Sequence, residues 1–307
     1  MKIAAILTVF NRRHKTVSCL QHLLKASDDY NRSADDHIDL SVFITDDGCT
    51  DGTSEAVKSE FPTADIHIIE GTGSLFWAGG MRLAWQTAID CGISWDYFLL
   101  LNDDTNVFSN VFQELFGADS HGFRQKGCHG LSSGVTCQPG NPDEVTYGGF
   151  NFASKAKGRR VIVQPTGKPQ PVDLVHANIL LVHHSVVESI GVFYAGYKHS
   201  SADFDYGMLA RRHGFPTMVT ANVCGECECD HDTDKEEIHK LMEMSLAERK
   251  RHVTSPTRSD RDYLTFVRRN LPLRYPLAVI LRSVRLYLPS LYCHITRLRG
   301  VYKQLSH

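Results

Sequence analysis

Two adjacent acidic residues follow a short apolar run in the first third of the chain. The run from Phe98 to Leu101 is entirely apolar, and Asn102 separates it from Asp103 and Asp104. An apolar run of this length predicts a buried strand, whose carboxyl end is where open α/β sheets bind their ligands. Neighbouring carboxylates repel each other, and a hard divalent cation shared with substrate phosphates would relieve that repulsion. The alternative is a solvated loop after a core strand.

Two further acidic segments have a chemical and a structural interpretation each. Asp46 and Asp47 end a second strand-like run and begin the segment DDGCTDGT, whose glycines, aspartates and threonines suit a tight turn followed by a helix start. Taken alone, such a segment is more often a turn than a ligand site. Asp203 lies near the start of a predicted helix that Gly214 ends, where the helix dipole favours a carboxylate. Taken alone, it is more often a helix cap than a base.

The predicted elements bring these residues together. Strand-like runs at residues 3–10, 40–45, 66–69 and 96–101 alternate with helical patterns at 17–24, from Ser54, and at 78–89. This alternation predicts an α/β protein with a mostly parallel, right-handed βαβ sheet flanked by helices. Strand ends would then gather residues 8–11, 46–47 and 103–104 along one edge. For residues 128–176 we predict antiparallel strands and loops that line a second half-site.

The charge of the chain is unevenly distributed. The 307 residues carry a net charge of −2, but residues 257–307 hold ten Lys or Arg and two Asp, a net of +8, against −10 for the rest. No acidic residue follows Asp262. We therefore expect a catalytic domain over residues 1–225 and a basic, mainly helical C-terminal extension over 226–307. Basic and apolar residues on one helix fit either an interfacial membrane anchor or a helix packed on its own core, and the lack of acids favours the membrane.

Cysteine use indicates the expected compartment. The chain has nine cysteines, an odd number and mostly scattered, and it opens on a strand-like run without a signal-peptide pattern. We therefore expect a protein of the reducing cytoplasm with mostly free thiols, located at the inner face of the membrane if the tail makes contact there. No apolar run approaches the length of a transmembrane helix.

In their order and spacing, the motifs resemble those of the inverting family 2 glycosyltransferases, which have the GT-A nucleotide-sugar-binding fold. The matching segments are Thr8–Arg12, Asp46–Thr53 and Leu100–Thr105. Gly73–Met81 looks like the glycine-rich segment of the rhamnosyltransferase-like branch, and Gly191–Phe193 with Ala202–Gly207 resembles its acceptor-side block. The likeness covers about residues 1–220. Cys49 stands where Ser is usual, and Ala202 stands where Glu is common, which leaves Asp203 as the base candidate of that doublet.

The resemblance implies a role for each conspicuous residue. Asp47 and Thr8 would contact the nucleotide base, with Asn11 and Arg12 lining the same pocket, and Asp103 would face the ribose or the sugar. Asp203 would take the proton from an acceptor hydroxyl as that hydroxyl attacks the anomeric carbon, in one displacement that inverts its configuration. The expected substrate-binding residues are Thr8, Phe10, Asn11, Arg12, Asp47, Trp77, Gly79, Gly80, Arg82 and Asp103.

A divalent metal is the cofactor that the resemblance implies. Asp104 would hold Mg²⁺ or Mn²⁺, which neutralises the leaving diphosphate as a Lewis acid. His231 is a candidate second ligand, because related enzymes place a histidine downstream of the base on this metal. Cys224, Cys227 and Cys229 precede it at a spacing that also occurs in zinc sites, but no second, separated ligand pair is apparent. Free thiols on a loop are the alternative for these cysteines.

The sequence thus predicts a metal-dependent inverting glycosyltransferase of hexosyl or rhamnosyl type. Its donor would be a UDP- or dTDP-sugar, and its acceptor a glycan or lipid-linked hydroxyl in surface polysaccharide synthesis. Nucleic acid is not an expected partner. One alternative is a sugar-phosphate nucleotidyltransferase, which would usually carry a basic glycine-rich loop near the first strand, where this chain has none. The other is a non-catalytic module that binds nucleotide or glycan without turnover.

Overall fold

The structure is a computed structural model, and it describes residues 1–298 with the exception of 157, 230–233 and 259. Its strands are β1 (Lys2–Val9), β2 (Asp39–Asp46), β3 (Ile66–Glu70), β4 (Tyr97–Leu101), β5 (Asn106–Val107), β6 (Leu131–Gln138), β7 (Asn141–Tyr147), β8 (Gly149–Ser154), β9 (Arg159–Ile162), β10 (Gln170–Pro171), β11 (Leu174–Val175), β12 (Ile179–His183) and β13 (Thr217–Glu226). Its helices are α1 (Arg13–Ser33), α2 (Thr53–Glu60), α3 (Phe76–Asp90), α4 (Val111–Lys126), α5 (His184–Ile190), α6 (Ala202–Arg212), α7 (Asp234–Glu243), α8 (Leu246–Thr254), α9 (Asp260–Asn270), α10 (Tyr275–Tyr287) and α11 (Pro289–Leu298). Two short 3₁₀ turns, η1 (Pro256–Arg258) and η2 (Pro272–Arg274), complete the described elements.

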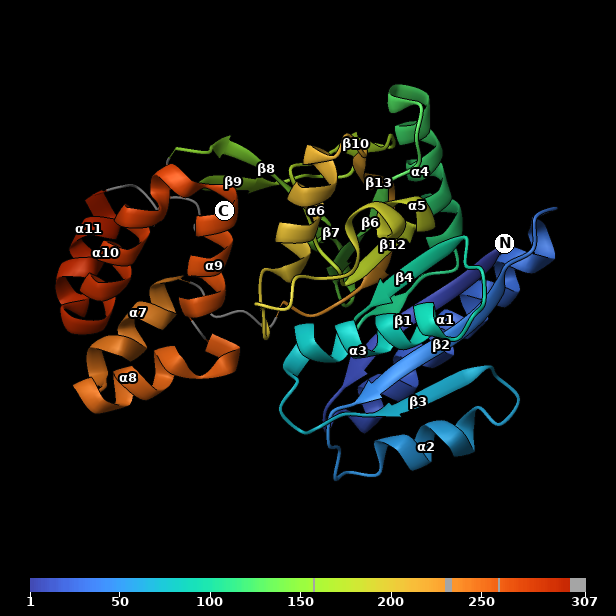
Figure 1. The fold of residues 1–307 in the computed structure, drawn as a ribbon, viewed down its shortest axis with the longest axis horizontal. Helices are drawn as coiled ribbons and strands as arrows, with labels where there is room; N and C mark the ends of the chain where they lie inside the picture. The colour runs from blue at the N-terminus through green and yellow to red at the C-terminus, as the bar shows by residue number, and fades with distance from the viewer. Residues whose placement is uncertain (157, 230–233, 259, 299–307) are drawn as a thin grey trace.

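A ten-stranded sheet forms the centre of the molecule (Figure 1). Its main path runs β10-β13-β6-β12-β4-β1-β2-β3, with β5 on β13 and β7 on β6. Strands β4, β1, β2 and β3 are parallel to one another, as the alternation of strands and helices predicts. The carboxyl ends of β1, β2 and β4 therefore lie along one edge of the sheet. The mostly parallel α/β fold predicted from the sequence is confirmed.

Helices cover both faces of the parallel half, which explains its continuous apolar strands. Alternate side chains of β1 point to opposite faces, so Ala4 and Ile6 join one core with α3, α5 and α6. Ile3, Ala5 and Leu7 join the other core with α1, α2 and α4. Because the central residues of β1 and β4 are buried on one side or the other, these stretches are apolar throughout.

The second half of the sheet is mixed, and it extends the first half across β4. Strand β12 runs antiparallel to both β4 and β6, while β13 runs parallel to β6. A separate three-stranded sheet, β11-β8-β9, stands beside it. The antiparallel strands predicted for residues 128–176 are therefore present. Helix α6 packs against β11 and begins close to the strand ends of the parallel half.

The five C-terminal helices lie together on one side of the sheet (Figure 1). Helix α9 packs on α6, and its Phe266 and Val267 are buried in the same core as α3 and α6. Helix α10 packs on α9 and α11 in turn. Among the helices of the described residues, none combines the length and apolar character needed to span a bilayer.

Candidate functional site

The acidic pair after β4 is neutralised by an arginine from the end of β1. Arg12 Nη1 lies 2.5 Å from Asp104 Oδ2 and 3.4 Å from Asp103 Oδ1. The Thr16 hydroxyl donates to the other oxygen of Asp103 at 3.3 Å. Asp103 is only 6% exposed, and burial raises its pKa to about 7 although the Arg12 charge lowers it. The pair therefore requires positive charge, and in this structure Arg12 supplies it.

The donor chemistry of this pair fits a hard divalent cation. Two carboxylates offer the oxygen ligands that Mg²⁺ and Mn²⁺ prefer, and substrate phosphates or water would complete such a site. The described residues contain no group of three or more His, Cys, Asp or Glu that could hold a metal ion by themselves. A metal on Asp104 would also require Arg12 to give up its contact there. His231, the second ligand predicted, lies outside the described residues.

The cysteines beside this edge do not gather around a common point within the described residues. Cys224 is buried in the core, and burial raises its pKa to about 12. Cys227 Sγ lies 3.8 Å from Asp104 Oδ1 and accepts from Asn178 Nδ2 at 3.5 Å. Cys229 is exposed. Of the three, Cys227 is the one that contacts the acidic pair within the described residues.

The turn after β1 is joined to the loop that follows β2. Asn11 adopts a φ of +51°, a conformation that Asn tolerates better than most residues. Its Oδ1 accepts from the Thr50 backbone at 2.7 Å, and its own N–H donates to Cys49 Sγ at 3.2 Å. Phe10 beside it is 56% exposed. The two loops form one unit with an uncovered aromatic ring at the strand edge.

Asp47 holds the loop that leads into α3. One carboxylate oxygen accepts from the backbone N–H groups of Gly73 and Leu75 at 2.8 and 3.2 Å, and the other accepts from Phe76 at 2.8 Å. The side chain is almost fully buried. A carboxylate with three backbone donors is a strong local anchor. Asp47, which we predicted to contact the nucleotide base, thus uses its carboxylate to hold a loop of its own chain.

The glycines of α3 let the helix lie directly on the first strand. A Cβ on Gly80 would lie 2.0 Å from Thr8 Oγ1, and the Gly80 carbonyl accepts from the Thr45 hydroxyl at 2.8 Å. A Cβ on Gly79 would meet Leu75 at 3.1 Å. The sequence requires glycine at 80 because no side chain fits between α3 and Thr8. Both glycines are buried packing positions at the helix start.

Two longer side chains of α3 link separate parts of the site. Trp77 Nε1 donates to Asn102 Oδ1 at 2.8 Å, immediately before the acidic pair. Arg82 Nη1 donates to the carbonyls of Tyr197 and Tyr194 at 2.9 and 3.3 Å, in the loop that leads to α6. Burial lowers the pKa of Arg82. Helix α3 therefore ties the strand edge to the start of α6.

Asp203 lies in the first turn of α6 and is 9% exposed. Its Oδ1 accepts from the Phe204 backbone at 2.9 Å, and its Oδ2 accepts from the Ala177 backbone at 3.2 Å. Burial raises the pKa of this carboxyl to about 6, against a lowering by the backbone hydrogen bonds and by Arg160. A carboxylate with this pKa is matched to proton abstraction near neutral pH.

A short segment before β12 connects Asp203 to the acidic pair. The Asn102 backbone N–H donates to the Asn178 carbonyl at 3.2 Å, and Ala177 donates to Asp203. Asn102 directly precedes Asp103. The acidic pair and Asp203 thus lie on either side of residues 177 and 178. Two chain segments a hundred residues apart in sequence meet at one edge.

Arg160 completes this side of the site, although no sequence pattern predicted a role for it. The centre of its guanidinium lies 5.1 Å from the ring centroids of both Phe150 and Phe204. Cation–π contacts of this kind fix the position of an otherwise mobile arginine. Arg160 therefore holds a positive charge next to Asp203. Its signal in the sequence was only a basic residue in a predicted loop.

Helix α9 supplies three residues that sequence reasoning also missed. Asp262, 1% exposed, accepts from the backbone N–H groups of Lys198, His199 and Ser200 at 3.3, 2.8 and 3.0 Å. Buried Asp205 of α6 accepts from Arg269 Nε at 3.0 Å and from Asn270 Nδ2 at 2.5 Å. Helix α9 therefore holds both the loop before Asp203 and the helix that carries it.

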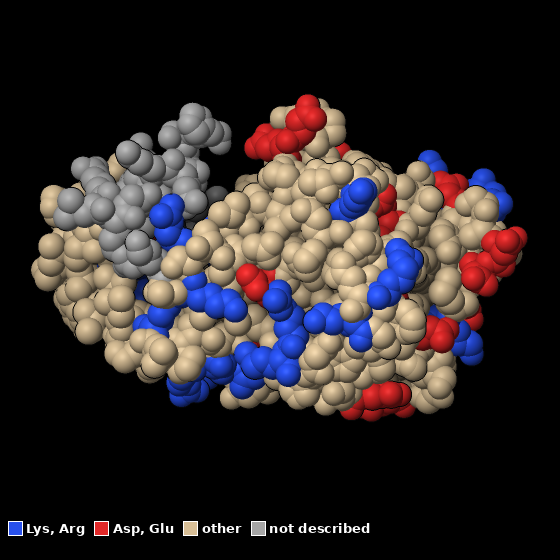
Figure 2. All heavy atoms as spheres, turned by 90° about the horizontal axis from the view of Figure 1, so that it is seen from above, with Lys and Arg blue, Asp and Glu red and all other residues tan. Residues whose placement is uncertain are grey.

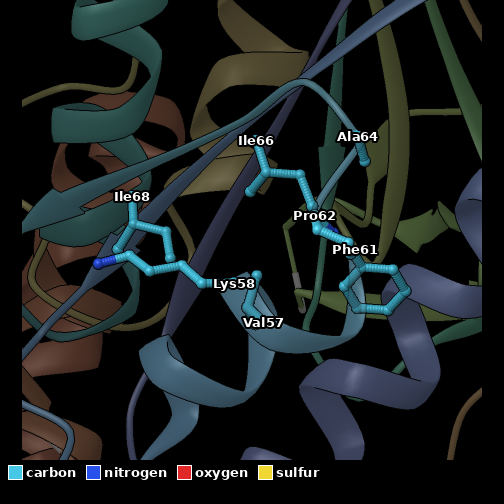
Figure 3. Close-up of a pocket in the computed structure, with 7 residues that line it drawn as sticks. All are labelled: Val57, Lys58, Phe61, Pro62, Ala64, Ile66 and Ile68. Atoms are coloured by element: carbon cyan, nitrogen blue, oxygen red, sulfur yellow. The ribbon is translucent and has the colours of Figure 1, made fainter.

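A pocket elsewhere on the molecule does not belong to this site. It lies between α2 and β3, the strand at the edge of the sheet, and Figure 3 shows its lining side chains. They are Val57, Lys58, Phe61, Pro62, Ala64, Ile66 and Ile68. This lining is apolar apart from Lys58. It includes no acidic residue and no residue from the carboxyl ends of β1, β2 and β4. It has the character of a gap between packed elements.

Comparison with known proteins shows the fold. No protein-family model matches the chain, and no curated protein matches it in sequence. Residues 1–349 of TarS from S. aureus align with 94% of this chain and 75% of theirs, at a TM-score of 0.54 and 11% identity. The mannosyltransferase PcManGT from Pyrobaculum calidifontis, in complex with GDP-Man and Mn²⁺, aligns with 99% of this chain and 81% of its own, at 0.52 and 14%. TarS in complex with UDP-GlcNAc aligns with 89% and 73%, at 0.52 and 12%. The chain has the GT-A fold that its motifs predict.

Proposed function

We propose that this chain is an inverting glycosyltransferase that moves a sugar from a nucleotide-sugar to an acceptor hydroxyl. The observation that supports this most is the meeting of Asp203 and the Asp103–Asp104 pair on either side of residues 177–178. Asp203 has the burial and the pKa expected of a general base. The Asp103–Asp104 pair has the chemistry of an edge that binds a diphosphate. The structural likeness to TarS and to PcManGT, one solved with UDP-GlcNAc and the other with GDP-Man, agrees with this assignment.

In this proposal Asp203 is the general base. Its carboxylate takes the proton from the acceptor hydroxyl, whose oxygen attacks the anomeric carbon of the donor sugar. The bond from that carbon to the diphosphate breaks, and the nucleoside diphosphate leaves with the electron pair. One displacement inverts the anomeric configuration. Because burial raises the pKa of Asp203 to only about 6, the carboxyl is ionised and ready to accept a proton at neutral pH.

The donor would bind along the edge formed by β1, β2 and β4. Phe10 and Asn11 face this edge from the first turn, with Thr8 beneath them, and Asp103 would meet the ribose or the sugar. Asp47 would act through the loop at 73–76, because both of its oxygens already accept from that loop. Trp77 and Arg82 would hold the edge in shape through their contacts with Asn102 and Tyr197.

Mg²⁺ or Mn²⁺ is the proposed cofactor, held by Asp104 and by His231. When bound, it supplies positive charge that stabilises the leaving diphosphate. Arg12 would then turn from Asp104 toward the phosphates, where a guanidinium binds well. PcManGT was solved with Mn²⁺, which makes a divalent metal a reasonable choice for this fold.

The finer features of the proposal come from the sequence. We propose a UDP- or dTDP-sugar as donor, a hexosyl or rhamnosyl group as the transferred sugar, and a glycan or lipid-linked acceptor in surface polysaccharide synthesis. Such an acceptor places the enzyme at the cytoplasmic face of a membrane. The donor edge lies within residues 1–225, and we propose a catalytic domain that begins with these residues and continues through α9, which holds α6.

Calorimetric titration of UDP and dTDP, each with and without Mn²⁺, tests the donor site. We expect metal-dependent binding of one nucleotide, with Asp104→Ala abolishing the metal dependence. The matched control is Asp35→Ala, at an exposed position in the loop before β2. Absence of binding under every condition would contradict the proposal for these nucleotides, and GDP would then be titrated next.

Product analysis separates transfer of the sugar from transfer of the nucleotide. Incubation with a nucleotide-sugar and an acceptor should release the nucleoside diphosphate. Release of inorganic pyrophosphate from a nucleoside triphosphate and a sugar phosphate would instead identify a nucleotidyltransferase. Tight nucleotide binding with neither product would leave a binding module and reject the enzyme.

A further inference from the structure

Helix α10 turns its arginines toward the protein and its aliphatic residues toward solvent. Arg285 is only 8% exposed, and its Nη2 lies 3.3 Å from Asp260 Oδ1 and 3.8 Å from Glu237 Oε1. Arg282 Nη1 lies 2.9 Å from Asp260 Oδ1. The charged side of the helix is therefore used to neutralise acids of α7 and α9. A surface helix in water usually has the opposite orientation.

The outward side of α10 is mostly apolar, with the exposed Ser283 between Ile280 and Tyr287. Leu277, Ile280 and Tyr287 are exposed and follow one another at helical spacing, and Ile280 is 58% exposed. Leu273 just before the helix is 98% exposed, and Leu288 just after it is 55% exposed. Single exposed apolar residues are ordinary, but a stripe of them on one helix indicates a surface that is covered by something apolar.

Charge identifies what covers this stripe. The five C-terminal helices, residues 234–298, hold thirteen Lys or Arg and seven Asp or Glu, a net of +6 that remains after the ion pairs of α10. Lys250 Nζ also lies 5.9 Å from the ring centroid of Tyr287, at the side of the stripe. Figure 2 shows an uncharged outer rim at the end of the molecule that these helices form, and beside it several Lys and Arg side chains that outnumber the Asp or Glu among them. An apolar surface within a positive field fits an anionic lipid bilayer.

A second copy of the chain fits the stripe less well than a bilayer. Pairing two copies through this face would bring two surfaces of net positive charge together, and like charges across an interface oppose binding. A bilayer with anionic headgroups supplies both the apolar phase and the opposite charge. Tyr275 and Tyr287 on α10 are the kind of residue that prefers the boundary between headgroups and acyl chains.

We propose that η2, α10 and the start of α11 form a docking surface for an anionic membrane. Helix α10 has 13 residues, which is too short to cross a bilayer, so it would lie in the plane of the interface. Leu273, Leu277, Ile280 and Leu288 enter the acyl boundary, and nearby basic side chains contact the headgroups. Because α10 packs on α9 and α9 on α6, docking would hold the Asp203 edge near the membrane. Only this last consequence rests on the proposed function.

Vesicle flotation of the full chain tests the docking surface. The probes are vesicles of phosphatidylcholine alone and of phosphatidylcholine mixed with phosphatidylglycerol, at low and at high salt. We expect the chain to float with the mixed vesicles at low salt and to bind the neutral vesicles more weakly. Ile280→Ser combined with Leu288→Ser should lower the partition coefficient by about tenfold, because two large aliphatic side chains no longer enter the lipid.

The control removes two exposed apolar side chains, Ile93 at 39% and Phe123 at 42%, from another part of the molecule. Ile93→Ser combined with Phe123→Ser should bind vesicles like the unchanged chain. Thermal melts of both double variants show that they fold, and sedimentation shows their oligomeric state. The proposal is wrong if the unchanged chain ignores the mixed vesicles, or if the Ile280 and Leu288 variant binds them equally well. It is also wrong if sedimentation shows that the substitutions only convert a dimer of the chain into monomers. None of these readouts depends on turnover or on nucleotide binding.

Discussion

At the residue scale, burial and hydrogen bonding act on Asp203 in opposite directions. Burial disfavours its charge, while the amides of Phe204 and Ala177 and the charge of Arg160 favour it, and the resulting pKa is about 6. As the proposed base, Asp203 must be ionised. We therefore expect kcat/KM to fall as the pH falls through about 6. Arg160→Gln should move this limb to higher pH, because it removes a charge that lowers the pKa.

Arg159→Gln is the control for the pH profile, because Arg159 is an exposed neighbour on the same strand. It should leave the acidic limb in place. An unchanged limb in Arg160→Gln would contradict the electrostatic link between Arg160 and Asp203.

Removal of the Asp203 charge tests the proposed base directly. Asp203→Asn keeps a side chain of the same shape but cannot take a proton. We expect turnover to fall about 10²- to 10⁴-fold, the usual contribution of a general base. Nucleotide titration should be unchanged, because we propose that Asp203, which accepts from Ala177, acts on the acceptor and not on the nucleotide. Full activity in this variant would reject the assignment.

Arg12 and a metal should compete for Asp104. The guanidinium lies 2.5 Å from Asp104 Oδ2, so a cation bound there must displace it. Arg12→Gln should therefore bind Mn²⁺ more tightly in the absence of nucleotide, as measured by calorimetry. The same variant should melt at a lower temperature in chelator, because two adjacent carboxylates then lack a counter-charge, and Mn²⁺ should restore the loss. Exposed Arg13→Gln is the control. Equal Mn²⁺ affinity in both variants would contradict this competition.

At the element scale, α9 acts as a brace for α6. Asp262 accepts three backbone hydrogen bonds from the 198–200 loop. Asp262→Ala leaves those N–H groups without this acceptor, at a cost of about 1–3 kcal/mol if they stay buried. We expect faster hydrogen exchange across residues 198–206 and a lower kcat, while nucleotide binding persists. Thr265→Ala on the same helix is the control. Unchanged exchange in this loop would show that α9 does not hold it.

The parallel half of the fold was predictable because its physical signal is local. Strands such as Phe98–Leu101 are buried on both faces, so they appear as uninterrupted apolar runs. The acidic residues then fall at their carboxyl ends by sequence order alone. Glycines 79 and 80 were noticed for their spacing, but their reason, the contact with Thr8 and Leu75, is visible only in the structure.

Two features were not predictable: the support that α9 gives to α6, and the side of α10 that faces the protein. Both depend on contacts between segments that are distant in sequence. Asp262 resembles an ordinary acidic residue in the first turn of a helix, and its partners lie more than sixty residues away. The apolar stripe of α10 follows from periodicity. Nothing in that periodicity states which side faces the body, and only the ion pairs with Asp260 and Glu237 decide it. The roles assigned to single residues stay predictions.

At the scale of the whole molecule, the first part of the C-terminal extension belongs to the body. Phe266 and Val267 of α9 share a core with Trp85 and Tyr206, and Arg269 neutralises the charge of buried Asp205. Residue 226, where we predicted the extension to begin, is the last residue of β13. We therefore propose that the unit needed for function continues through α9 to about Asn270.

Truncation tests where that unit ends. A chain of residues 1–225 would leave Asp205 buried without its arginine and would uncover the face of α6 that Phe266 contacts. Removing one partner of a buried charge pair costs about 3–5 kcal/mol, a large part of the stability of most domains. A chain of residues 1–270 keeps those contacts and loses α10 and α11. We expect 1–270 to give a cooperative melt and to bind nucleotide, and 1–225 to melt far lower or to aggregate. Circular dichroism and calorimetry measure both, and equal melting temperatures would place α9 outside the functional unit.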